Sequence, residues 1–260
     1  CVCEGLWKQM AQGGNLLSVT GPGLTAPGFL LTKLGKFDTM VSMNGFALEK
    51  NKLSREELAV MTHAISRGIA HVFAETAADV PVGFVPVGSV KFCESVLGRT
   101  VKPDYYPEFL SKHLYRKVWD DRRWPLKKGI FVKPADAYKR FTGFLTRGGY
   151  SGKAAGPYML SERLDFVKEW RYYVSCGKVV ASGGYYGAEE DAHGPALPPI
   201  EFPEDWCGAV DFGLTKDGRM ALVEAQHPYA IGWYGPNEDN ALYTQFLVDG
   251  WDYMKRGETK

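Results

Sequence analysis

Residues 210–234, VDFGLTKDGRMALVEAQHPYAIGWY, contain two apolar segments on either side of a turn signal. The D-G pair in this turn is typical of a β-hairpin, so the sequence predicts two antiparallel strands. Asp211 lies at the start of the first strand, and Glu224 and Gln226 lie near the end of the second. A buried carboxylate is costly unless a cation or hydrogen bonds compensate it, so polar side chains in these strands indicate a ligand.

These three side chains can meet on one face of the hairpin. Glu224 and Gln226 are two residues apart, and alternation along a strand directs both to the same face. The turn returns their strand beside Asp211. Two carboxylates and an amide oxygen are hard ligands that suit Mg²⁺, which also binds nucleotide phosphates. An ion-pair network on an exposed hairpin explains the same pattern, so the residues alone leave both interpretations open.

The composition is that of an ordinary globular protein. The chain has 260 residues, 45% of them hydrophobic, and a formal net charge of +1. A net charge this small produces no overall electrostatic attraction to nucleic acid or to an anionic membrane surface. Neither is therefore expected as a partner. The five cysteines are scattered, which argues against a disulfide framework or a zinc site, and no apolar run of about 18 residues is present to span a membrane. We therefore expect a cytoplasmic protein.

The pattern of the amino-terminal half predicts an α/β domain. An S-x-x-E capping box at Ser54 predicts a helix from about Arg55 to Phe73. The segment VPVGFVPVGS predicts a strand, followed by a helix that Ser89 caps. Pro107 predicts the first position of another helix over YPEFLSKHLYRKVW.

From Gly129 onward, short β-branched and aromatic runs predict an antiparallel sheet. Cys176 and Gly177 separate the strands of one hairpin, and the D-G turn separates those of another. A final amphipathic helix backs the sheet, with its apolar side marked by Leu242, Phe246, Trp251 and Met254. The predicted fold class is α/β (α+β), with an amino-terminal domain over residues 1–125 and a second domain over residues 126–260.

The order strand, Asp211, D-G turn, strand and E-x-Q resembles the carboxy-terminal metal site of the ATP-grasp superfamily. In D-alanine ligases and their relatives, an Asp and a later E-x-N hold magnesium ions under the ATP phosphates, and the thirteen-residue step from Asp211 to Glu224 fits that arrangement. FVKP resembles the strand whose lysine touches the nucleotide, and EWRYYVSCGKVV resembles the hairpin that follows the nucleotide-binding hinge. The resemblance covers about residues 81–254 and is best for a phage and bacterial branch of ATP-grasp domain proteins.

The resemblance implies an ATP-grasp fold with a small pre-ATP-grasp-like amino-terminal domain and a cleft that holds ATP between sheets. It implies Asp211, Glu224 and Gln226 as ligands of Mg²⁺, although the family usually has Asn where this chain has Gln226. It also implies nucleotide contacts, which we expect from Lys133, Arg116, Leu160, Ser161, Glu162 and Glu169. Among these, Lys133 is expected at the phosphates, and Glu162 at the adenosine hydroxyls or amino group. A basic helical face is an alternative explanation for Arg116, and a cross-strand ion pair is an alternative for Glu169 and for Arg171.

Catalytic cations are expected from Arg171, Lys139 and Arg140. Many relatives carry an arginine two residues before the metal aspartate, and this chain has Ala209 there. Arg171 lies on a strand whose arginine faces the reacting carboxylate in related ligases. Lys139 and Arg140 lie in a segment that resembles the family's phosphate-covering loop.

The activity that the resemblance implies is ATP-dependent carboxylate–amine ligation through an acyl phosphate, forming a C–N bond. The expected cofactors are ATP and Mg²⁺, and the expected substrates are a small-molecule or peptide carboxylate and an amine or similar nucleophile. Two alternatives remain open. One is a kinase that uses the same fold, and the other is a nucleotide-binding or interaction module without catalysis, which Gln226 and Ala209 favour.

Overall fold

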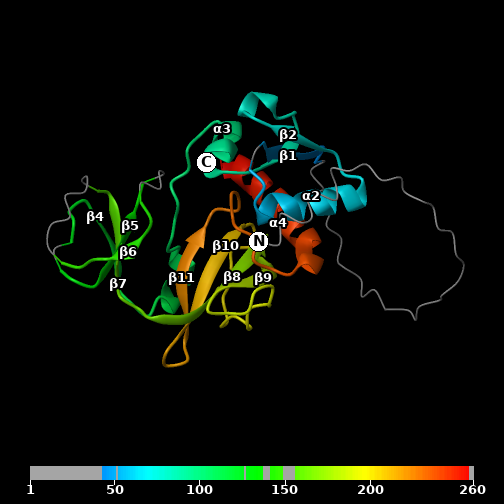
Figure 1. Cartoon of the computed structure of the whole chain (residues 1–260). Coiled ribbons are helices and arrows are strands. Elements are labelled where there is room, and N and C mark those ends of the chain that lie inside the picture. The colour runs from blue at the N-terminus through cyan, green and yellow to red at the C-terminus, as the bar shows by residue number, and fades with distance from the viewer. Residues whose placement is uncertain (1–42, 51, 126, 137–140, 149–155, 258–260) are drawn as a thin grey trace, which may run out of the picture. The chain divides into compact units, whose positions relative to one another are not determined.

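Three sheets organise the part of the chain that the computed structural model describes, which is residues 43–50, 52–125, 127–136, 141–148 and 156–257 (Figure 1). The first sheet has the order β2-β1-β3, and both of its pairings are parallel. Its strands are β1 (Gly45–Glu49), β2 (His71–Ala74) and β3 (Phe84–Val87). Parallel strands need crossover connections, and α2 (Arg55–Arg67) supplies the one between β1 and β2.

Helix α2 begins at the predicted capping box and ends earlier than predicted. The Glu57 carboxylate accepts a hydrogen bond from the Ser54 backbone N–H at 2.8 Å. The predicted end at Phe73 is wrong, because Gly68 takes a left-handed conformation (φ 65°) and caps the helix. The chain then pairs with β1. The helix predicted after Ser89 is confirmed as α3 (Val90–Leu97), which follows the short 3₁₀ helix η1 (Ala77–Asp79) and β3.

The second sheet has the order β4-β7-β5-β6, and all of its pairings are antiparallel. Its strands are β4 (Val118–Asp121), β5 (Ile130–Pro134), β6 (Phe144–Leu145) and β7 (Tyr158–Glu162). The long helix predicted from Pro107 is wrong. The segment forms only the 3₁₀ helix η2 (Glu108–His113), because Tyr115 has a left-handed backbone (φ 49°) that interrupts helical geometry before β4.

The third sheet carries both predicted hairpins. Its order is β11-β10-β8-β9, with antiparallel pairings throughout. Its strands are β8 (Phe166–Ser175), β9 (Lys178–Tyr186), β10 (Gly208–Thr215) and β11 (Met220–Gln226). Cys176 and Gly177 both have positive φ, 46° and 72°, as a tight two-residue hairpin turn requires. The two predicted hairpins are therefore confirmed, but the strands after Gly129 divide between two sheets.

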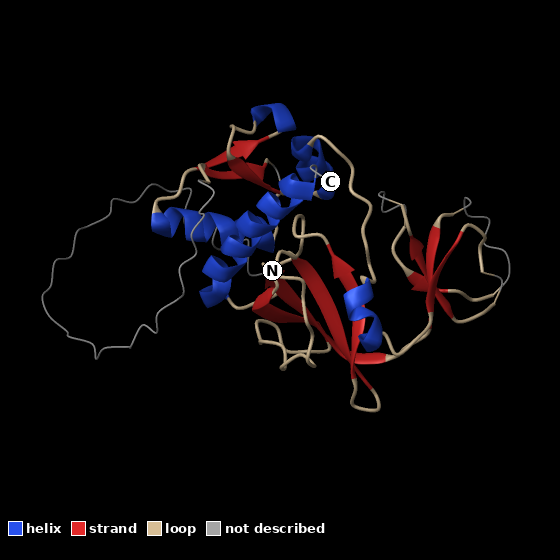
Figure 2. Cartoon of the chain, turned by 180° about the vertical axis from the view of Figure 1, so that it is seen from behind, coloured by secondary structure: helices blue, strands red, loops and turns tan. Residues whose placement is uncertain are grey.

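The last helix, α4 (Asn240–Arg256), follows the 3₁₀ helix η3 (Asn237–Asp239) and packs between the first and third sheets (Figures 1 and 2). Phe246, Trp251 and Met254 are buried in one core with Phe46 of β1. The predicted apolar side is wrong at Leu242, which is 43% exposed, and Tyr243 is buried in its place. The end of the chain thus completes the core of its amino-terminal part.

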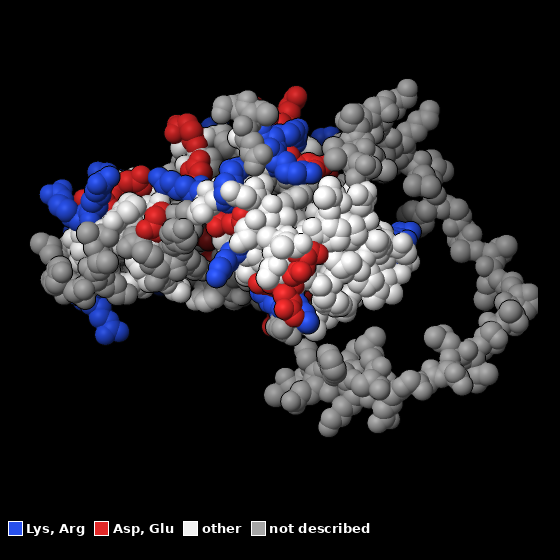
Figure 3. Space-filling view, turned by 90° about the horizontal axis from the view of Figure 1, so that it is seen from above, with Lys and Arg blue, Asp and Glu red and all other residues white. Residues whose placement is uncertain are grey.

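The mixed α/β fold class is confirmed. Residues 43 onward in the described ranges belong to one compact unit, and the domain boundary at residues 125/126 stays a prediction. On the face shown in Figure 3, basic and acidic side chains both occur among the described residues, beside a wide area without charged side chains. Among the described helices, none combines the length and apolar character that crossing a membrane requires.

Candidate functional site

A cleft of about 1310 Å³ is lined by residues from the second and third sheets and from α3 with the segment after it. From the second sheet it receives Lys133 and Glu162, and from the third sheet Glu169, Glu224 and Gln226. These five residues were all predicted at the site from the sequence. The cleft therefore gathers basic and oxygen-bearing side chains between two sheets.

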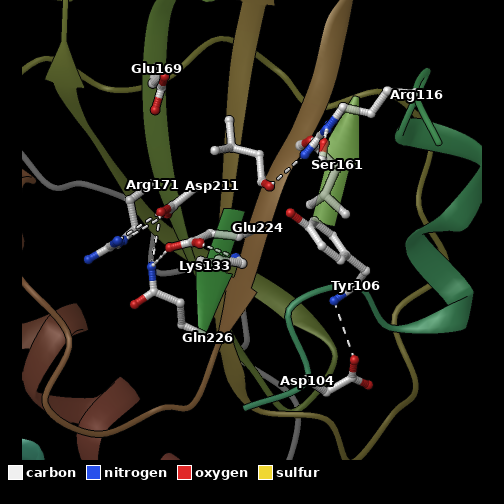
Figure 4. Close-up of polar contacts among 12 residues, drawn as sticks. Asp104, Tyr106, Arg116, Lys133, Ser161, Glu169, Arg171, Asp211, Glu224 and Gln226 are labelled. Carbon is white, nitrogen blue, oxygen red and sulfur yellow. Dashed lines mark hydrogen bonds and ion pairs between the residues drawn. The ribbon is translucent and has the colours of Figure 1, made fainter. Parts of the chain in front are cut away.

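The three predicted metal ligands meet as expected. Asp211 and Glu224 are register partners across β10 and β11, and Gln226 lies two residues further along β11. The Gln226 amide Nε2 donates to Asp211 Oδ2 at 3.1 Å and to Glu224 Oε1 at 2.7 Å (Figure 4). The hairpin geometry predicted from the sequence is confirmed, and the ligand role stays a prediction.

Asp211 also forms a buried ion pair with Arg171, which is the cross-strand ion pair left open for this arginine as an alternative to a catalytic role. Arg171 is its register partner on β8 and donates from Nε and Nη2 to the two carboxylate oxygens, each at 2.7 Å (Figure 4). Arg171 is 7% exposed and Asp211 is 1% exposed. Burial raises the pKa of Asp211, and Arg171 offsets part of that increase. For Arg171, burial acts to lower the pKa, but the charge and the hydrogen bonds of Asp211, together with nearby tyrosines, outweigh it and hold the pKa well above its ordinary value.

Arg171 does not line the cleft where it was expected to face a substrate carboxylate. Its guanidinium lies over the rings of Tyr185 and Tyr234, with its Cζ 5.6 Å and 5.2 Å from their centroids. The Tyr185 hydroxyl donates to Glu169 Oε2 at 2.5 Å. Burial raises the pKa of Glu169, and the carboxylates of Asp211 and Glu224 add to this effect. Arg171 thus contacts Asp211, Tyr185 and Tyr234, and its catalytic role stays a prediction.

Lys133 and Glu224 form the ion pair that joins the two sheets. Lys133 Nζ lies 2.6 Å from Glu224 Oε2, with side-chain exposures of 7% and 26%. The same nitrogen lies 3.3 Å from the ring centroid of Tyr105 and 5.0 Å from that of Tyr106. The predicted phosphate-binding lysine is therefore enclosed by one carboxylate and two aromatic rings.

Arg116 is a second link between these sheets. Its guanidinium donates to the carbonyl oxygens of Leu222 and Val223 on β11, at 2.5 Å and 2.9 Å. It also donates to Ser161 Oγ on β7 at 2.8 Å. Arg116 lines the cleft, so its predicted nucleotide contact stays a prediction beside this bracing role.

Three adjacent residues of β7 that were predicted to contact the nucleotide have different surroundings. Leu160 is buried in a core cluster with Val132, whereas Ser161 and Glu162 line the cleft. The Glu162 carboxylate accepts a hydrogen bond from the Lys117 backbone N–H at 2.9 Å. Their nucleotide contacts stay predictions. Lys139 and Arg140 lie outside the described residues.

Sequence reasoning missed the aromatic residues of the cleft. Tyr105, Tyr106, Phe131 and Phe166 all line it. A signal was present in the tyrosine pair of KPDYYP, because adjacent aromatic residues between prolines offer two rigidly placed rings in a loop.

The oxygen donors fit Mg²⁺ in part. No group of three or more His, Cys, Asp or Glu side chains is arranged to hold a metal ion in the described ranges. Glu224 and Gln226 line the cleft, but both oxygens of Asp211 are bound by Arg171. Mg²⁺ in nucleotide sites commonly takes only one or two protein carboxylates and completes its shell with water and phosphate oxygens. Glu224 and Gln226 lie on the cleft wall as such ligands, and Glu224 would bind a metal ion in exchange for its contacts with Lys133 and the Gln226 amide.

The two-sheet cleft and its residues belong to an ATP-grasp protein. The chain is a member of the family described as ATP-grasp domain, family 2 of the R-2-K clade, which matches residues 109–244, just over half of the sequence. The predicted superfamily is thereby confirmed.

Solved structures that are similar to this chain include an ATP-grasp protein and a ligase. One is a RimK domain protein ATP-grasp from Sphaerobacter thermophilus DSM 20745, at 13% identity and a TM-score of 0.40, over 80% of this chain and 98% of that chain. The other is D-alanine–D-alanine ligase from Bacillus anthracis complexed with ATP, at 11% identity and a TM-score of 0.42, over 84% of this chain and 100% of that chain. A search of curated proteins found no match.

The buried pair gives a prediction about stability. Arg171→Met should lower the free energy of unfolding by about 3–5 kcal/mol, because it leaves the Asp211 carboxylate buried without its cation. Urea denaturation followed by circular dichroism measures this change. The double variant Arg171→Met/Asp211→Leu should recover most of the loss, because an apolar pair of similar volume carries no desolvation cost. A single variant as stable as the wild type would show that Asp211 does not need Arg171.

Proposed function

We propose that this protein is an ATP-dependent carboxylate–amine ligase that binds ATP and Mg²⁺ in the cleft between its second and third sheets. The observation that carries the proposal is the meeting of Lys133 from β5 with Glu224 and Gln226 from β11 in an ATP-grasp chain. A phosphate-binding cation and hard oxygen donors for a divalent ion are the groups that phosphoryl transfer from a nucleotide requires.

The nucleotide contacts proposed here follow the walls of the cleft. Lys133 lines the cleft and binds phosphate oxygens as a compact point charge. Ser161 and Glu162, at the end of β7 where the chain passes to β8, contact the adenosine, together with the backbone at Leu160. Glu169 and Arg116 line the wall between these positions.

Glu224 and Gln226 are the proposed cleft-facing holders of Mg²⁺, which neutralises charge on the phosphate oxygens when it is bound. Asp211, the third predicted ligand, is proposed to hold Gln226 in position. It accepts a hydrogen bond from Gln226, and Arg171 fixes its position. Gln226 is therefore oriented by two carboxylates before any ligand arrives.

The proposed reaction has two steps. A substrate carboxylate oxygen attacks the γ-phosphorus of ATP, and the bond to the β–γ bridging oxygen breaks, giving an acyl phosphate and ADP. An amine then attacks the acyl carbon and expels inorganic phosphate, forming a C–N bond and releasing one proton. Lys133 stabilises the charge that shifts among the phosphate oxygens, and Lys139 and Arg140 are proposed to assist it. The substrates are a small-molecule or peptide carboxylate and an amine.

A second candidate is a nucleotide-binding module without ligase activity. The observation that favours it is the engagement of both Asp211 oxygens by Arg171, which leaves fewer free oxygen donors at the cleft. Such a protein binds MgATP and releases no phosphate with any carboxylate and amine.

Nucleotide binding should depend on both the divalent ion and Lys133. Calorimetry should detect ATP binding with Mg²⁺ and little heat with a chelator, because Glu224 otherwise repels the triphosphate. Lys133→Ala should weaken MgATP binding by about 1–3 kcal/mol, the range for a charge-assisted hydrogen bond. Lys168→Ala, an exposed lysine of β8, is the matched control and should bind as the wild type does. Equal binding by Lys133→Ala would remove Lys133 from the nucleotide site.

Ligase activity should appear as phosphate release that requires a carboxylate and an amine together. Pools of both substrate classes, with MgATP, identify the active combination. Glu224→Gln keeps the volume of the side chain and removes its charge, so turnover should fall by orders of magnitude, and the thermal midpoint should fall because the nearly buried Lys133 loses its carboxylate partner. Phosphate release that needs only one substrate would indicate a kinase, and wild-type turnover in Glu224→Gln would contradict the metal assignment.

A further inference from the structure

Tyr105 lies where the connection between α3 and η2 meets β5 of the second sheet and β11 of the third sheet. It belongs to the connection between α3 and η2, and it lies upstream of the residues that match the family. Its backbone carbonyl accepts a hydrogen bond from the N–H of Ala225 at 2.9 Å, between Glu224 and Gln226 on β11. Since β11 is an edge strand of the third sheet, this bond anchors the connection to the strand that carries the proposed metal ligands.

The ring of Tyr105 covers Lys133. The ammonium nitrogen lies over the ring face, 3.3 Å from its centroid, and on another side it contacts Glu224 Oε2 at 2.6 Å. A cation over an aromatic face is attracted by the ring quadrupole, and the attraction grows when both groups are removed from water. Lys133 is 5% exposed, so this contact is largely desolvated.

The adjacent residues fix the direction of this ring. The Tyr106 backbone N–H donates to Asp104 Oδ1 at 3.3 Å, which forms a local turn. The Tyr106 ring lies between the two basic residues that link the sheets, 5.0 Å from Lys133 Nζ and 5.5 Å from Arg116 Cζ. Burial raises the pKa of Tyr105 to about 12, and the charge of Glu224 adds to this increase, so the phenol stays neutral at physiological pH.

We infer that Tyr105 is a positioning residue for the phosphate-binding lysine. Its ring and the Glu224 carboxylate hold the Lys133 ammonium in one place, so that a nucleotide phosphate meets a fixed cation. A free lysine side chain has a large rotamer entropy that binding would otherwise have to remove. The inference rests on the proposed function in one respect, which is that Lys133 binds phosphate.

Two substitutions distinguish the effect of the aromatic ring of Tyr105 from the effects of its hydroxyl and of its side-chain volume. Tyr105→Phe keeps the aromatic face, and Tyr105→Leu fills similar space without it. By calorimetry, Tyr105→Leu should bind MgATP about five- to thirty-fold more weakly than the wild type, the range for a cation–π contact from partly to fully desolvated. Tyr105→Phe should bind within about two-fold of the wild type. The matched control is Tyr115→Leu, which removes a ring 5.0 Å from Arg219 Cζ, outside the cleft lining, and should have no effect.

Nuclear magnetic resonance of the ligand-free protein tests the contact directly. With lysine labelled with ¹³C at the ε carbon, the Lys133 signal is the one that disappears in Lys133→Arg. Its ε protons should be shifted upfield by the ring, should stay shifted in Tyr105→Phe, and should move toward the exposed lysines in Tyr105→Leu.

An unmoved Lys133 signal in Tyr105→Leu would overturn the inference. So would a Tyr105→Phe variant that binds MgATP as weakly as Tyr105→Leu. If the wild-type protein binds no MgATP, the proposed function fails, whereas the resonance comparison still decides whether Tyr105 positions Lys133.

Discussion

The buried ion pair between Arg171 and Asp211 is the interaction on which the candidate site depends. Two charges removed from water are stable only when geometry and hydrogen bonding are good, and the bidentate contact at 2.7 Å meets that condition. The pair joins β8 to β10 at one register position, and a shift by one residue would turn every side chain on the strand to the opposite face. Gln226 is hydrogen-bonded to the same carboxylate, so the register of the third sheet also sets the place of a cleft-lining amide.

The two sheets of the cleft are connected by basic side chains. Lys133 reaches from β5 to Glu224, and Arg116 binds β7 and the carbonyl edge of β11. An unpaired strand edge offers free carbonyl groups, and Arg116 satisfies two of them on β11. The cleft is therefore bounded by cations that are already in position, which lowers the cost of organising the site around an anionic ligand.

Much of this arrangement follows from local sequence. The D-G turn sets the hairpin, and strand alternation then brings Glu224 and Gln226 to one face beside Asp211, as observed. The end of α2 was missed because Gly68, and not the apolar periodicity, ends the helix. Long-range contacts were predicted less well: a cross-strand ion pair was left open for Arg171 without its partner, and the contact of Tyr105 with Lys133 was missed. The pairing of Arg171 with Asp211 depends on the register between strands forty residues apart, and the contact of Tyr105 with Lys133 depends on the path of a loop. Neither is encoded in a spacing that a single sequence displays.

We propose that the charged groups of this cleft are arranged to bind a nucleoside triphosphate. A crystal structure with a non-hydrolysable ATP analogue and Mg²⁺ tests it most directly. We expect the triphosphate to bind between the second and third sheets. A phosphate oxygen should lie within hydrogen-bond distance of Lys133 Nζ, and Glu224 should bind the metal. A nucleotide bound elsewhere, with the Lys133–Glu224 pair unchanged, would contradict it.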